Sequence, residues 1–257
     1  MKITFLGQNG LLIESKKSTI IVDPYLSDSV EKIEPSNKRR QPIDERFLSI
    51  KPNVVVITHA HADHYDEETL DKLLVGEETG EKTGKETDEG CGDGEGCGCT
   101  FFSPPSVFFK AKARYPKCNH VIFRSGTSVT VGEITFRTVR AEHSDAEAIG
   151  VIITAEGKNL YVTGDTLFSE NVFKSLPKIR FNAVFLPVNG RGNNMNATDA
   201  GCFAARIKPD FVVPVHFGMF DDLSGADVSK EINAQFKSGK ISGKIIIPEI
   251  YKEIEIK

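Results

Sequence analysis

Short apolar runs separated by turn-forming residues dominate the first 60 positions of the chain. Lys2–Leu6 and Gly10–Glu14 flank the turn Gly7-Gln8-Asn9-Gly10, and this arrangement predicts a β-hairpin. Thr19–Val22 predicts a third strand. Val54–Thr58 predicts a fourth strand, and its apolar character is typical of a strand that is covered on both faces.

Helical periodicity alternates with further strand patterns in the rest of the chain. Leucines at positions 70, 73 and 74 predict a helix over Glu67–Leu74, and helices are also expected over Ser106–Arg114 and near Ala197–Arg206. Two strand-rich halves with a similar order of elements predict an α/β (α+β) fold, in which two sheets pack face to face with helices outside. The strands predicted in the second half are His120–Phe123, Ser128–Val131, Ile134–Ala141, Ile149–Ala155, Asn159–Thr163, Ala183–Pro187, Phe211–Val215 and Lys244–Pro248.

The segment 76–100 breaks this pattern, because it is rich in glycine, acidic residues and cysteine and has almost no apolar side chains. Such a composition buries too little apolar surface to offset the entropy lost on ordering. We therefore expect a flexible acidic insertion within a single domain that spans 1–257. Cys91, Cys97 and Cys99, together with Cys118, would offer four sulfur ligands to zinc or iron. The usual C-x₂-C pairing is absent, however, and this favours incidental thiols.

Composition restricts the class of protein. Apolar residues make up 39% of the chain and charged residues 26%, which is ordinary for a soluble globular protein. The net charge of −4 gives no basis for nucleic acid as a partner. No apolar run approaches the length of a membrane span, and the first residues lack the pattern of a secretory signal, so we expect a cytoplasmic protein without a membrane partner. Five cysteines, an odd number, fit reduced thiols in that compartment.

The densest chemical signal is the run from Thr58 to His64, which closes the predicted strand with three imidazoles and one carboxylate. A single histidine is more often a solvated or buried side chain than a ligand. Three rings at this spacing without a metal would repel each other or be poorly solvated. Imidazole and carboxylate together supply ligands for more than one ion. The motif therefore predicts a metal site, and its candidate ligands are His59, His61, Asp63 and His64.

Three further residues of ligand type, His143, Asp165 and His216, each follow a predicted strand in the second half of the chain. Strand ends that pass into exposed loops commonly carry active-site residues. Taken singly, each histidine would more often be structural, but the shared position beside the first motif favours ligands for a second ion. His120 is the one histidine left out, and we expect it to be structural or at the surface.

The seven ligand candidates, in this order along the chain, resemble the complete ligand set of the metallo-β-lactamase superfamily. The resemblance extends over nearly the whole chain, and it implies the αββα sandwich of that superfamily. It also implies two metal ions, one held by His59, His61 and His143, the other held by Asp63, His64 and His216, with Asp165 bridging them.

A narrower resemblance is to the L-ascorbate-6-phosphate lactonase-like branch, which contains hydrolases often described as manganese- or zinc-dependent. The cysteine-rich insertion departs from that branch. The resemblance rests on five segments, at 7–13, 21–28, 163–166, 186–191 and 214–220.

The expected chemistry is hydrolysis by a hydroxide that two divalent ions share, with zinc or manganese expected and iron compatible with the same ligands. Asp63 would orient the hydroxide and Asp165 would fix the spacing of the ions, so both are catalytic candidates. Asp23, Thr58 and Asp145 are candidates for setting the imidazole tautomers, although each is also an ordinary turn or capping residue.

Substrate contacts are expected from Asn189 and Arg191, which follow a predicted strand; the arginine would bind phosphate or carboxylate through paired hydrogen bonds. Lys38-Arg39-Arg40 is a second candidate anion patch, although a charge run is usually solvated. The expected substrate is a small ester or lactone, with phosphorylated metabolites among the candidates. The alternatives are a phosphodiesterase on the same site and a di-iron oxidoreductase. The oligomeric state stays open, and a homo-oligomer is compatible with the sequence.

Overall fold

The computed structural model describes residues 1–75, 98–220, 223–237 and 243–256, and the strands within these ranges form two seven-stranded sheets. Both sheets mix antiparallel with parallel pairs. The first sheet has the order β14 (Glu253–Ile254), β1 (Lys2–Gly7), β2 (Gly10–Glu14), β3 (Thr19–Val22), β4 (Val54–Val56), β5 (Thr100–Ser103) and β6 (Asn119–Ile122). The second has the order β13 (Lys244–Ile245), β12 (Phe211–Val215), β11 (Ala183–Pro187), β10 (Lys158–Val162), β9 (Ile149–Ala155), β8 (Ile134–Arg140) and β7 (Ser128–Val131).

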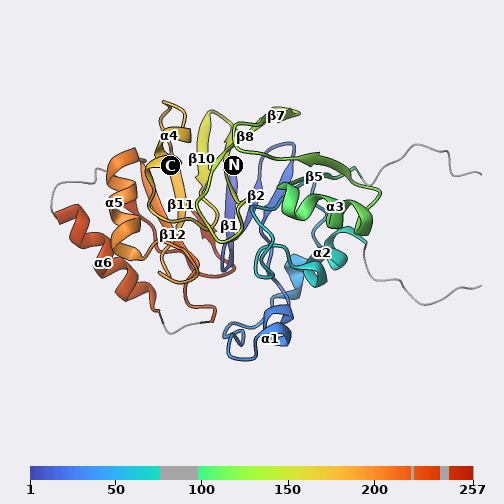
Figure 1. The fold of residues 1–257 in the computed structure, drawn as a ribbon, viewed down its shortest axis with the longest axis horizontal. Helices are drawn as coiled ribbons and strands as arrows, with labels where there is room; N and C mark the ends of the chain where they lie inside the picture. The colour runs from blue at the N-terminus through green and yellow to red at the C-terminus, as the bar shows by residue number, and fades with distance from the viewer. Residues whose placement is uncertain (76–97, 221–222, 238–242, 257) are drawn as a thin grey trace, which may run out of the picture.

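Helices cover the outer face of each sheet (Figure 1). Beside the first sheet lie α2 (Glu67–Leu74) and α3 (Pro105–Arg114), with the 3-10 helix η1 (Glu45–Ser49) in the same apolar cluster. Beside the second sheet lie α5 (Ala197–Ile207) and α6 (Gly225–Lys237), with the short α4 (Glu170–Ser175) next to them. The short helix α1 (Ser29–Ile33) lies away from both sheets. The predicted sandwich of two sheets with helices outside is confirmed.

The main apolar core lies between the two sheets and takes side chains from both. The strand β4 shows how the sequence produces this layering. Val54 and Val56 belong to the core between the sheets, whereas Val55 and Ile57 pack in the cluster beneath α2 and α3. All four side chains are fully buried, and burial of each contributes about 1.5–3 kcal/mol. The prediction of a strand covered on both faces is confirmed.

Two predicted strands are shorter in the structure by two residues or more. The strand expected over Val54–Thr58 ends at Val56, because the backbone N–H of Thr58 donates to Asp23 Oδ1 at 2.8 Å instead of continuing the ladder. The strand expected over Lys244–Pro248 is limited to Lys244–Ile245. The sequence patterns also missed β5, β14, α1, η1, α4 and α6.

The predicted insertion 76–100 extends too far at its C-terminal end. Cys99 is buried in the cluster beneath α2 and α3, and Thr100 begins β5 of the first sheet, so both belong to the folded domain. Residues 76–97 lie outside the described residues, and with them Cys91 and Cys97, so the four-sulfur hypothesis stays a prediction. Among the described residues, no helix combines the length and the apolar character needed to cross a membrane.

Candidate metal centre

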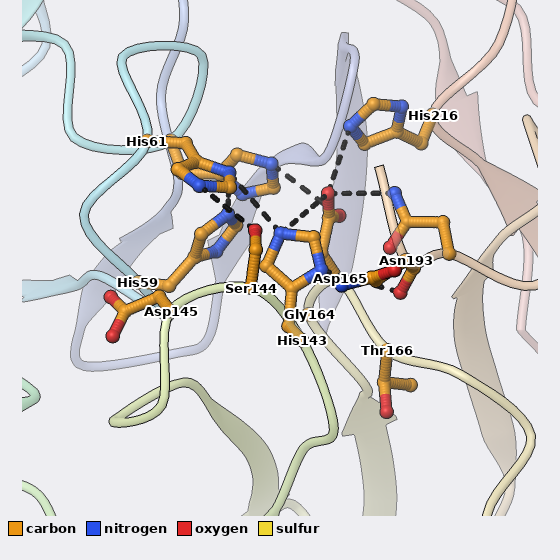
Figure 2. A network of polar contacts seen from close by, with 12 residues as sticks. His59, His61, His143, Ser144, Asp145, Gly164, Asp165, Thr166, Asn193 and His216 are labelled. Atoms are coloured by element: carbon orange, nitrogen blue, oxygen red, sulfur yellow. Dashed lines mark hydrogen bonds and ion pairs between the residues drawn. The ribbon is translucent and has the colours of Figure 1, made fainter. Parts of the chain in front are cut away.

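All seven ligand candidates meet at one edge of the sandwich, each on a segment that follows a strand. The segment after β4 carries four of them, and the segments after β8, β10 and β12 carry one each. Figure 2 shows side chains from these segments turned toward one another, with Asp165 in the middle of the network. The structure therefore brings together every predicted site residue of this set, and their role as ligands stays a prediction.

The first group of ligand atoms contains only imidazole nitrogens. His61 Nδ1 lies 3.1 Å from His59 Nε2 and 3.1 Å from His143 Nε2. Two nitrogens that bind one zinc ion tetrahedrally are about 3.3 Å apart, given Zn–N bonds of about 2.0–2.1 Å. The spacing of the three rings therefore fits a shared ion.

The second group contains Asp63, His64 and His216. Asp63 Oδ2 lies 3.3 Å from His216 Nε2 and 3.6 Å from His64 Nε2. Nitrogen and carboxylate oxygen together suit zinc, manganese or iron, so the chemistry of the group does not select a metal.

Asp165 lies between the two groups. Its Oδ2 is 3.2 Å from His216 Nε2 and 3.8 Å from His143 Nε2, and its Oδ1 is 3.4 Å from His64 Nε2. A carboxylate in contact with histidines of both groups is in the position that a bridging ligand requires. Its location matches the role that the sequence resemblance implies.

Two buried atoms in the cluster, His64 Nε2 and Asp165 Oδ1, make no hydrogen bond within the described part of the chain, although they lie 3.4 Å from each other. A buried polar atom without a partner is costly, so such atoms need an explanation. A cation would satisfy both atoms. The residues present therefore fit a metal centre.

The charges in the cluster divide the histidines into two kinds. Burial lowers the pKa of His59 and of His143, so these rings are kept neutral and able to bind metal. Burial would also lower the pKa of His64 and His216, but nearby carboxylates, Asp165 first among them, outweigh it. They raise the pKa of His64 well above its usual value and that of His216 to about 10.

Buried hydrogen bonds orient the ligand rings behind the cluster. Asp23, which is fully buried, accepts a hydrogen bond from His64 Nδ1 at 2.9 Å and from Thr58 Oγ1 at 2.6 Å. Thr58 Oγ1 in turn lies 3.1 Å from His59 Nδ1. Both rings therefore direct Nε2 toward the cluster, because a hydrogen bond to Nδ1 fixes the orientation of a ligand imidazole. The contacts predicted for Asp23 and Thr58 are present.

Asp145 makes different contacts from those predicted. Its carboxylate accepts from the backbone N–H of Ala60 at 3.0 Å, from Ser106 Oγ at 2.8 Å and from the N–H of Glu147 at 2.9 Å. The prediction that it sets an imidazole tautomer is wrong, because its hydrogen bonds go to two loops and to α3. Asp145 instead ties the histidine loop to the segment that carries His143.

Glycine is needed immediately before the bridging carboxylate. Gly164 has φ +62°, in the left-handed region that favours glycine. A Cβ at this position would lie 2.8 Å from the carbonyl oxygen of Ile149 and 3.0 Å from Thr58 Cβ. The tight turn after β10 places Asp165 against the histidine loop, and a larger residue would push the two apart.

Two buried amides belong to the site and were not predicted. Gln8 Nε2 donates to Asp63 Oδ2 at 2.8 Å, and Asn194 Nδ2 donates to Asp165 Oδ2 at 2.7 Å. Gln8 lies in the turn between β1 and β2, and Asn194 lies in the loop after β11. Neither position has a sequence signal of its own, because a turn glutamine and a loop asparagine are commonplace.

A cleft of about 1060 Å³ opens above the cluster. Asn189 and Arg191 both line it, and the arginine is exposed. Its lining also includes apolar side chains of α1 and of the segment after His216, among them Val30 and Phe220. Asn189 and Arg191 are therefore placed where a bound substrate could reach them, and their role in binding stays a prediction.

The second predicted anion patch does not form from all three of its residues. Arg39 is buried, and its guanidinium donates to the carbonyl oxygens of Gln41 and Tyr25 and to the Tyr251 hydroxyl. Its hydrogen bonds hold loops together, so it is not available to an anion. Lys38 lies 3.7 Å from Glu31 and does not line the cleft. Arg40 is exposed and lines a neighbouring hollow together with Asn189 and Arg191, so its part in anion binding stays a prediction.

His120 lies away from the cluster, as expected. Its Nε2 donates to the carbonyl oxygen of Tyr115 at 2.8 Å, and its ring packs against Phe101 with the ring centroids 5.2 Å apart. His120 is therefore a structural residue of β6.

Comparison with known proteins agrees with this geometry. A UPF0173 metal-dependent hydrolase from Oenococcus oeni is 25% identical over 266 residues, covering 99% of this chain and 100% of the relative. One from Listeria welshimeri is 28% identical over 265 residues and covers 100% of both. A solved structure, described as a novel metallo hydrolase from the archaeon Ignicoccus hospitalis, has the same fold, with a TM-score of 0.71, 18% identity and coverage of 98% and 97% of the two chains.

The narrower likeness to the L-ascorbate-6-phosphate lactonase-like branch is not tested by these matches and stays a prediction. Residues 2–216 match the family described as the Beta-lactamase superfamily domain. This range contains all seven ligand candidates, from His59 to His216. The chain therefore belongs to the metallo-β-lactamase superfamily, as the order of its ligand candidates predicted.

Proposed function

We propose that the protein is a metal-dependent hydrolase that opens a small ester or lactone at a centre of two divalent ions, with zinc or manganese as the metals. The observation that supports this most directly is the arrangement of ligand atoms in two groups on either side of Asp165, at the base of an open cleft. The relatives described as metal-dependent hydrolases agree with it. When bound, two such ions supply a nucleophilic water near neutral pH and polarise the substrate oxygen.

The protein's own residues have separate tasks in this proposal. His59, His61 and His143 hold one ion; Asp63, His64 and His216 hold the other. Asp165 is buried between the groups and fixes their separation. Asp63 lines the cleft and is partly exposed, so its carboxylate can accept a hydrogen bond from the attacking water and orient it.

Arg191 is proposed to bind the anionic part of the substrate. It lies at the mouth of the cleft, and its guanidinium can hold a phosphate or carboxylate with two parallel hydrogen bonds. Because the side chain is exposed, we expect a contribution at the low end of charged hydrogen bonds, about 1.4 kcal/mol or tenfold in affinity.

Arg191→Ala is therefore expected to raise KM about tenfold for anionic esters and to leave KM for neutral esters unchanged. The measurement is steady-state kinetics on a matched pair of esters, one neutral and one carrying a phosphate. Arg137→Ala is the control, because Arg137 is an exposed arginine of β8 outside the cleft. An equal rise in KM for both esters would contradict the assignment.

The experiment that tests the proposed function starts from metal-free protein reloaded with zinc, manganese or iron. Each preparation is screened against lactones, carboxylic esters, phosphorylated sugars and phosphodiesters, and oxygen consumption is recorded in parallel. Turnover of an ester or lactone by the zinc or manganese form supports the proposal. Turnover confined to phosphodiesters would replace it with phosphodiesterase activity, and oxygen consumption by the iron form alone would indicate an oxidoreductase.

A further inference from the structure

Gln8 stands out among the residues of the site because it joins ligands that come from the two different sheets. Its Nε2 donates to Asp63 Oδ2 at 2.8 Å, and Asp63 belongs to the loop after β4 in the first sheet. The backbone carbonyl oxygen of Gln8 accepts a hydrogen bond from the backbone N–H of His216 at 2.6 Å, and His216 follows β12 in the second sheet. Gln8 is 1% exposed, so its own side chain is buried, whereas the bond to the partly exposed Asp63 lies at the floor of the cleft.

The backbone at this point is held in a costly conformation. Gln8 has φ +52° and His216 has φ +60°, both in the left-handed region that residues other than glycine seldom adopt. Such a residue persists only where surrounding contacts hold it in place. The two strained residues are joined directly by the 2.6 Å hydrogen bond. The strain therefore lies at the contact between the first hairpin and the second ligand group.

The shortest hydrogen bond of the side-chain amide goes to Asp63 Oδ2, at 2.8 Å. Gln8 Nε2 also lies 3.3 Å from His216 Nδ1 and 3.2 Å from His216 Nε2. Ring nitrogens point in different directions, so a single atom nearly equidistant from both cannot lie along both of their hydrogen-bond directions. The amide therefore bonds to Asp63 and lies against the imidazole of His216 within hydrogen-bonding distance. Gln8 thus fixes the carboxylate and the ring relative to each other.

We infer that Gln8 is a positioning residue for the second metal ion: its amide N–H holds Asp63, and its backbone holds His216, in the arrangement that binds the ion. The inference rests on the dimetal centre of the proposed function but not on the identity of the substrate. It predicts an asymmetric defect. In the described part of the chain no hydrogen bond joins Gln8 to His59, His61 or His143, so loss of the amide is expected to act on only one of the two ions.

The test measures metal binding without substrate. Metal-free wild type and Gln8→Ala are titrated with zinc, and separately with manganese, in competition with a chelator of known affinity. Wild type is expected to bind two ions. In Gln8→Ala the dissociation constant of one ion rises about 10–100-fold, as is usual when an outer hydrogen bond to a ligand is lost, and that of the other changes by less than about threefold.

Gln8→Glu decides whether the amide acts through its donor. Glutamate has nearly the same size but offers only acceptor oxygens when ionised, and it would repel Asp63. The donor role predicts that this variant loses affinity for the same ion at least as strongly as Gln8→Ala. Retained or tighter binding would overturn the inference, because it would show that an oxygen at this position binds the ion directly.

Two other variants separate positioning from general destabilisation. Asn182→Ala removes an amide that donates to the Asp210 carboxylate at 3.0 Å, away from the cluster, and should leave both dissociation constants unchanged. Asn194→Ala removes the donor to Asp165, which contacts both groups, and should weaken the binding of both ions.

Chemical denaturation of each metal-free variant confirms that it is folded before titration. If wild type binds fewer than two ions, the dimetal centre of the proposed function is wrong, and this inference fails with it. If wild type binds two ions and Gln8→Ala binds both as tightly, this inference alone is wrong.

Discussion

Replacing His61 with alanine is expected to lower kcat/KM by about 10³-fold while the fold is retained. His61 is an exposed member of the first ligand group, and its Nδ1 lies 3.1 Å from the ligand atoms of both His59 and His143. Removal of one of three nitrogens leaves an incomplete site for the first ion. A catalytic metal contributes several kcal/mol to the transition state, and a loss of about 4 kcal/mol corresponds to 10³-fold.

The measurement combines kinetics on the best substrate of the screen with metal content per chain. His61→Ala should bind about one ion less than wild type, and its unfolding without metal should match wild type because the side chain is exposed. His120→Gln is the control, since that histidine packs in β6 away from the cluster. Full activity of His61→Ala would eliminate a mechanism that needs both ions.

Asp23→Asn is expected to destabilise the metal-free protein by about 3 kcal/mol. The buried carboxylate accepts hydrogen bonds from the Thr58 N–H and hydroxyl, from His64 Nδ1 and from Asn9 Nδ2. Asparagine keeps the volume and tolerates φ +42° at this position, but it places an N–H₂ group where an acceptor is needed. Loss of one partner in a buried charged network commonly costs 3–5 kcal/mol.

Urea denaturation in the presence of a chelator measures the decrease in the free energy of unfolding. Asp23→Asn should also weaken metal binding about 10–100-fold, because His64 and His59 lose the groups that orient them. Asp66→Asn is the matched control: Asp66 is equally buried but caps α2, so its loss should lower stability without changing metal affinity. A destabilised Asp23→Asn with unchanged metal affinity would show that Asp23 supports the fold only.

The sequence predicted the ligand cluster because its signal is local. His59, His61, Asp63 and His64 lie within six positions, and His143, Asp165 and His216 each follow an apolar strand whose position the hydrophobic pattern indicates. Strand ends in this type of sandwich meet at one edge, so a correct prediction of the strands also predicts that the residues following them lie close together. The layers were predicted for the same reason, since strands covered on both faces require two layers of cover.

Other parts of the structure depend on contacts that no local pattern encodes. The short helices α1 and α4 have five and six residues, too few for a helical period to emerge. The strand β5 begins directly after a segment of low apolar content, and only pairing with β4 and β6 defines it. Arg39 resembled part of an anion site because sequence shows its charge and not the carbonyl oxygens around it.

The amides of the site show the same limit. Gln8 and Asn194 lie far from Asp63 and Asp165 in the sequence, and the hydrogen bonds that connect them arise only when the hairpin and the loop after β11 fold against the cluster. Metal ligands can be recognised in a sequence by residue type. The residues that orient them can be recognised only from interatomic distances in the folded structure. For this reason the sequence does not reveal Gln8 and Asn194 as residues that orient ligands. The role predicted for Asp145 is wrong for the same reason.

Four ligand candidates come from the first sheet and three from the second, so neither half of the sandwich contains a complete centre. Each half would therefore coordinate cations poorly until the other had docked in register. Stoichiometric metal uptake then serves as a quality assay for recombinant material: a preparation in which the halves have associated wrongly would be underloaded, even where its circular dichroism spectrum looked native.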